Sequence, residues 1–105
     1  MRVIVTPGAR ADMAALVDFY DAKPERRGDE MVDEFDRAVE AIRDRPRVHA
    51  PVDDDYPGIE VREFYVRRFH QRILFVIHND EAFVFTVIHA TRRAGAGHRR
   101  LDTFQ

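Results

Sequence analysis

The chain has 105 residues, of which 45% are hydrophobic and 34% charged, as is typical of one globular domain with its own core. It contains no cysteine, which excludes a disulfide framework and a thiolate metal centre and fits a reducing cytoplasm. No apolar run is long enough to cross a bilayer, and the N-terminus lacks the basic-then-apolar order of a signal peptide. We therefore expect a single cytoplasmic domain over residues 1–105, with no membrane partner.

The formal net charge of −2 hides an uneven distribution. Residues 1–59 carry nine basic and fourteen acidic side chains, whereas residues 60–105 carry eight arginines, five acids and four of the five histidines. Arginine binds phosphates and carboxylates bidentately and keeps its charge. The second part is therefore predicted to bind nucleic acid or an acidic protein segment. A solvated sheet edge, where charge discourages aggregation, is the alternative.

The first half of the chain predicts one strand and two helices. Residues 2–5 are rich in β-branched side chains and predict a short strand. Thr6-Pro7 is an N-cap and first-turn pair for a helix over about residues 9–22, whose apolar residues recur at helical spacing. A second amphipathic helix is predicted over about residues 24–45. We expect the two helices to pack as an antiparallel hairpin against a sheet.

Residues 46–58 are predicted to form a loop that contains the run Asp53, Asp54 and Asp55. Adjacent carboxylates rarely converge on one ion, and their spacing is not that of a calcium loop. No two histidines have the helical spacing of a zinc site. We therefore expect a solvated turn here, and neither a metal nor a cofactor in the protein.

Residues 60–69, 72–78 and 83–90 predict three antiparallel strands, because the turns between them are too short for a crossover. Since successive strand residues point to opposite faces, residues 83, 85, 87 and 89 are expected to share one face. The sheet is expected to have one packed face and one cationic face or rim. The arginines set along this run are Arg62, Arg67, Arg68, Arg72, Arg92 and Arg93. From about residue 94 the chain is glycine-rich and basic, and we expect a flexible tail.

The predicted fold class is α+β, in the order β-α-α-β-β-β, with a two-helix hairpin packed on a mainly antiparallel sheet. In this order and spacing, the chain resembles the RelE/ParE superfamily of bacterial type II toxins over nearly its whole length. The stretches that carry the resemblance are Ala9-Arg10-Ala11-Asp12-Met13 with Leu16 and Tyr20, Ile42-Arg43-Asp44-Arg45-Pro46, Val61-Arg62-Glu63-Phe64, Phe69-His70-Gln71-Arg72-Ile73-Leu74-Phe75, and Val87-Ile88-His89-Ala90 before Arg92-Arg93.

The resemblance implies two kinds of action. ParE-like members bind and block DNA gyrase, which needs no catalytic residue. RelE-like members cleave mRNA on the ribosome, and for this Arg72 and Arg92 match two arginines of the nucleases, while His98 falls where they place a tyrosine or histidine. Such a metal-independent endoribonuclease would use the arginines to hold the phosphate and His98 as acid or base.

The ParE-like interpretation is favoured, because the lysines of the nucleases are missing and Glu63 and Tyr65 stand near those positions. The long helical hairpin and the strand that ends at His89 also look more like ParE. The ribosome-dependent nuclease and a non-toxic member of the superfamily remain as alternatives.

The resemblance also implies a cognate antitoxin, whose acidic, amphipathic segment would cover the toxin in a hetero-oligomer. The residues expected to bind this antitoxin or the target are Arg62, Arg67, Arg68, Arg72, His89, Arg92 and Arg93.

Overall fold

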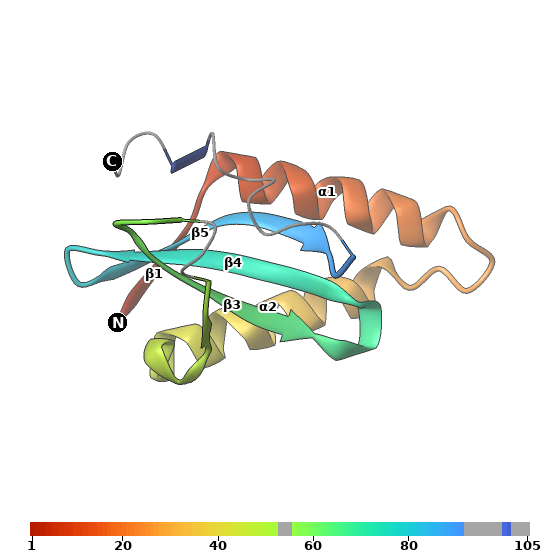
Figure 1. The fold of residues 1–105 in the computed structure, drawn as a ribbon. Coiled ribbons are helices and arrows are strands. Elements are labelled where there is room, and N and C mark those ends of the chain that lie inside the picture. Colours follow the sequence, from red (N-terminus) through yellow and green to blue (C-terminus); the bar gives the residue numbers. More distant parts are fainter. Residues whose placement is uncertain (53–55, 92–99, 102–105) are drawn as a thin grey trace.

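A computed structural model describes residues 1–52, 56–91 and 100–101. It has the predicted α+β architecture (Figure 1). The elements are β1 (Arg2–Val5), α1 (Pro7–Asp21), α2 (Gly28–Asp44), β2 (Ala50–Pro51), β3 (Glu60–Val66), β4 (Gln71–His78) and β5 (Glu81–His89), with 3-10 turns at η1 (Pro46–Val48) and η2 (Arg67–Phe69). Within residues 46–58, predicted as a loop, the described residues contain one 3-10 turn and the short strand β2. No helix in the described part of the chain is long and apolar enough to span a membrane.

The strands form one sheet in the order β1-β5-β4-β3-β2. β1 runs parallel to β5, and the other neighbours are antiparallel. Figure 1 shows α1 and α2 as a hairpin, joined at one end and running alongside the sheet. The predicted helical hairpin on a mainly antiparallel sheet is confirmed.

The helix ends follow from local hydrogen bonding. Thr6 caps α1 as predicted, since its Oγ1 accepts from the Ala9 N–H at 3.3 Å and Pro7 follows in the first turn. α2 begins at Gly28, four residues later than predicted. The preceding Arg26 has a left-handed φ of 48°, which interrupts a helix, and the carboxylate of Asp21 accepts from the Gly28 N–H at 2.9 Å.

The hairpin turns differ in kind. Asn79 and Asp80 form the predicted tight turn, with φ of 50° and 62°. The strand predicted to reach Phe69 instead ends at Val66, and η2 turns the chain into β4. This turn is anchored by Phe69, whose buried ring packs edge-on against Tyr20 at 4.8 Å.

A β-bulge in β5 changes which side chains share a face. Leu74 pairs with Thr86 and Phe75 with Val84, so Phe85 is the extra residue. Beyond this bulge, Val87 lies on the same side as Val84, and Ile88 packs with Phe83 and Phe85 on the other side. The prediction that residues 83, 85, 87 and 89 share one face is therefore wrong.

Both faces of the sheet are packed. On one side, Met13, Met31 and Ile42 of the helices pack on β4 and β5. On the other side, Leu74, Val76 and Phe85 are covered by the buried side chains of Val52, Tyr56 and Leu101. The expectation of a single packed face is thus corrected, since apolar side chains also fill the centre of the second face.

Candidate partner-binding surfaces

The predicted arginines do not share one face. Arg62 lies opposite Phe75 on the helix side of the sheet. Arg72 lies opposite Ile88, which belongs to the apolar cluster on the other side. The structure therefore divides the predicted cationic surface between two sides of the molecule.

Arg62 is held by its own chain. Its Nε bonds to Glu60 at 3.1 Å, and one terminal nitrogen donates to the carbonyl oxygen of His49 at 2.8 Å. Glu60 also accepts two hydrogen bonds from Arg47, each of 2.9 Å. The hydrogen bonds from Arg47 are the largest cause of the lowered pKa of Glu60; together with the bond from Arg62 they outweigh burial, which acts to raise it. The carboxylate of Glu60 therefore stays charged and is paired with both Arg47 and Arg62.

Arg68 and Arg72 are ion-paired as well. Arg68 lies 3.2 Å from the carboxylate of Glu30 on α2, and Arg72 bonds to Glu63 of β3. Glu63 and Arg72 are diagonal neighbours on adjacent strands, a separation that long side chains can span. An anionic partner would have to compete with these carboxylates for either arginine.

The remaining predicted residues have different environments. Arg67 is exposed and forms no ion pair within the described residues. His89, at the end of β5, accepts at Nδ1 from the Thr91 N–H at 3.2 Å, so a neutral ring carries its proton on Nε2. Arg92, Arg93 and His98 lie outside the described residues, as do the three consecutive aspartates.

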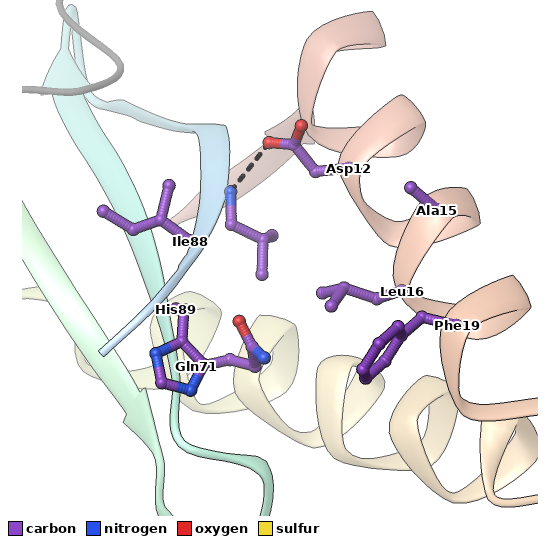
Figure 2. A pocket seen from close by; sticks show the side chains of 8 residues that line it. Asp12, Ala15, Leu16, Phe19, Gln71, Ile88 and His89 are labelled. Atoms are coloured by element: carbon purple, nitrogen blue, oxygen red, sulfur yellow. Dashed lines mark hydrogen bonds between the residues drawn. The ribbon is translucent and has the colours of Figure 1, made fainter. Parts of the chain in front are cut away.

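An open groove between α1 and the end of β5 has a volume of about 400 Å³. Figure 2 shows Ala15, Leu16 and Phe19 of α1 on one side and Ile88 of β5 on the other. The full lining is Asp12, Ala15, Leu16, Phe19, Gln71, Val87, Ile88 and His89. The middle of the groove is therefore apolar, and polar groups stand at its ends.

Phe19 is the most conspicuous residue of this groove, because 55% of its surface is exposed. Leu16 and Tyr20 of α1 pack against the core, and Phe19 lies outside that stripe. Sequence reasoning missed this residue, although a large aromatic side chain off the buried stripe of a helix is a usable signal for a binding surface.

The outer side of α1 extends the apolar surface. Ala11, Ala14 and Ala15 are exposed there with Phe19, beside the exposed charged residues Arg10 and Asp18. α2 differs, because its exposed side carries acids and arginines, among them the pairs Glu34–Arg37 and Glu40–Arg43. The exposed side of α1 therefore carries more apolar residues than that of α2, and an apolar patch of this kind on a surface helix marks a candidate interaction site.

The polar ends of the groove are well satisfied. At one end, Gln71 Nε2 donates to the hydroxyl of Tyr20 at 3.4 Å, and this hydroxyl donates to the Phe69 carbonyl at 3.4 Å. At the other end, Asp12 accepts from the Val87 N–H at 3.0 Å. Partial burial acts to raise the pKa of Asp12, but hydrogen bonds from Arg100, Val87 and Thr86 outweigh it, so the pKa lies below its usual range.

The described residues contain no cluster of histidine and acidic side chains that could hold a metal ion. The geometry instead presents apolar surface framed by hydrogen-bonded polar groups, which is the anatomy of a protein-docking surface.

Comparison with known proteins identifies the family. The model of the ParE toxin family, of the type II toxin–antitoxin system parDE, matches residues 3–94. The chain belongs to the ParE toxin family. A solved structure of the chromosomal ParDE toxin–antitoxin system from P. aeruginosa is similar in fold, with a TM-score of 0.71 and 19% sequence identity, over 85% of this chain and 95% of that chain. A search of curated proteins finds no match.

Membership of the ParE family confirms the predicted resemblance. The groove along α1 and the paired arginines are then features of a ParE-family toxin of a type II toxin–antitoxin system.

Proposed function

We propose that this ParE-family protein inhibits bacterial growth by binding DNA gyrase in the cytoplasm, and that a cognate antitoxin neutralises it. The observation that carries the proposal is the match of the ParE family over residues 3–94, which includes both described helices and, apart from Arg2 of β1, the described strands. Blocking an enzyme by binding requires surface complementarity and no catalytic residue.

The groove along α1 supports a binding mechanism. It offers apolar side chains from two elements, and Phe19 is exposed at its edge. Exposed aromatic residues beside an apolar pocket are the usual energetic centre of protein–protein interfaces. We propose that the antitoxin docks on this groove with an amphipathic segment.

The arginines have a secondary place in this proposal. Arg67 and His89 are exposed and we propose that they contact the antitoxin or the target, as do Arg92 and Arg93. Arg62, Arg68 and Arg72 already have partners, so their part is limited to exchanging one carboxylate for another. Such an exchange adds little net affinity.

The nuclease alternative has less support. It requires Arg72 to hold a phosphate, yet Arg72 bonds to Glu63, whose negative charge would repel that phosphate. Its other proposed catalytic groups, Arg92 and His98, lie outside the described residues.

Induced expression in a bacterial host tests the proposal. We expect growth arrest with loss of plasmid supercoiling, and relief of both by co-expression of the antitoxin encoded in the neighbouring reading frame. Rapid loss of translated mRNA with normal supercoiling would contradict the proposal and support the nuclease. Normal growth with abundant folded protein would support a non-toxic family member.

A further inference from the structure

Arg100 is held by hydrogen bonds to both a side-chain carboxylate and the backbone. Its guanidinium makes a two-pronged contact with Asp12, at 2.6 Å and 3.1 Å. One of its nitrogens also donates to the Phe85 carbonyl oxygen at 3.0 Å and lies 3.2 Å from Thr86 Oγ1. Bidentate charged hydrogen bonds are the strongest that side chains form.

The site that holds this guanidinium is built from α1 and from the bulge of β5. The bulge frees backbone groups from the sheet, and Asp12 Oδ2 takes up one of them through the Val87 N–H. Gly8, one turn before Asp12 on α1, makes room, because a Cβ at that position would lie 3.0 Å from Arg100 Nε. A carboxylate, a carbonyl and an open helix surface thus converge on one guanidinium.

The next residue fills a second, apolar site. The side chain of Leu101 is fully buried. It belongs to the cluster on the second face of the sheet, together with Tyr56, Phe85 and Ile88. The fold therefore receives two adjacent side chains in two different ways, a cation between α1 and the bulge and an aliphatic group against the sheet.

We propose that this is a binding site for an arginine–aliphatic pair, filled in cis by Arg100 and Leu101, and that the same pair from a partner protein takes it by exchange. The side chain of Arg100 is 38% exposed and that of Asp12 is 21% exposed, so an incoming arginine can reach the carboxylate. Exchange of one arginine for another leaves no unpaired buried charge. Asp12 also lines the groove along α1, which brings a partner in that groove within reach of the site.

The experiment uses the chain of residues 1–105 with both Arg100→Ala and Leu101→Ala, because these substitutions empty the site. The probe is a fluorescent peptide with the sequence of residues 97–105. We expect the peptide to bind this variant at least about tenfold more tightly than it binds the parent, in which the site is filled in cis. A peptide with glutamine in place of the arginine at position 100 should bind neither. Equal affinity for parent and variant, or no binding to the folded variant, would overturn the proposal.

A second measurement covers the case in which the double variant does not fold. Millimolar methylguanidinium should raise the Tm of the single Arg100→Ala variant and leave the parent unchanged, since a ligand stabilises the state that binds it. Methylammonium cannot form the bidentate contact, so it should leave the Tm of the Arg100→Ala variant unchanged. The same response to both ions would contradict a guanidinium site.

Sedimentation of the parent tests whether a second copy of the chain supplies the arginine–aliphatic pair. We expect a monomer. A dimer that dissociates on substitution of Arg100 and Leu101 would assign the exchange to a second copy of the chain and overturn the partner claim. None of these readouts depends on gyrase, so the proposed function and this site can fail separately.

Discussion

Arg62 and Arg72 lie on opposite faces of one sheet and are neutralised by different acids, Glu60 and Glu63. A single arginine platform for an acidic partner is therefore absent from the described part of the sheet. The apolar groove between α1 and β5 replaces it as the principal docking surface in our account.

Replacement of Phe19 by glutamate should weaken antitoxin binding by at least about tenfold, because loss of a central aromatic contact costs about 2 kcal/mol or more. The free energy of unfolding should change by less than about 0.5 kcal/mol, since Phe19 is exposed. Calorimetric titration of the parent and of Phe19→Glu with antitoxin measures the loss of affinity.

Val48→Glu is the matched control for Phe19→Glu. Val48 is also exposed, at 68%, but it lies in η1 and does not line the groove. Antitoxin affinity should stay within about twofold of the parent, far from the loss of a hot spot. If both glutamates weaken binding equally, the groove is not the docking surface.

Asp12→Asn should lower the free energy of unfolding by about 1–3 kcal/mol at neutral pH, because it removes charged hydrogen bonds to Arg100 and to Val87. The pKa of Asp12 is lowered in the folded state from its ordinary value of 3.8. Its contribution is therefore complete above that value and is lost as the pH falls through the lower, folded pKa.

The stability difference between the parent and Asp12→Asn should consequently narrow in acid. Urea unfolding from about pH 7 to about pH 3 measures it. Asp18→Asn, on an exposed position of the same helix, should show a difference near zero throughout. If the difference in the free energy of unfolding between the parent and Asp12→Asn grows on acidification, the assigned role of the carboxylate is refuted.

Gly28→Ala and Asp21→Ala should cost about 1 kcal/mol each, for one shared reason. A Cβ on Gly28 would lie 2.4 Å from Asp21 Oδ1, so the carboxylate must swing away and lose its bond to the Gly28 N–H. The double variant should then cost no more than either single one, and thermal unfolding of all four proteins tests this. Additive losses would show that the two residues act independently.

Local patterns of the sequence were enough to predict the fold. Thr6-Pro7 marks the start of α1, and Asn79-Asp80 marks the last hairpin, because capping and tight turns depend on neighbouring residues. The start of α2 was missed because the left-handed Arg26 and the cap from Asp21 have no clear signature in sequence.

The candidate site was harder to predict because it depends on distant residues. The bulge that exchanges the faces of β5 is stabilised by Asp12, which lies 75 positions before Val87 in the sequence. No residue pattern within β5 predicts this bulge. The arginine partners could have been anticipated in part, since Glu63 and Arg72 become neighbours as soon as β3 and β4 are paired. Arg68 pairs with α2, and that contact depends on how the hairpin is placed on the sheet.

The most direct test of the account is a supercoiling assay with purified DNA gyrase and the purified chain. We predict inhibition that rises with the concentration of the chain and is relieved by an equimolar amount of antitoxin. Undiminished supercoiling in the presence of a large excess of folded chain would contradict the account.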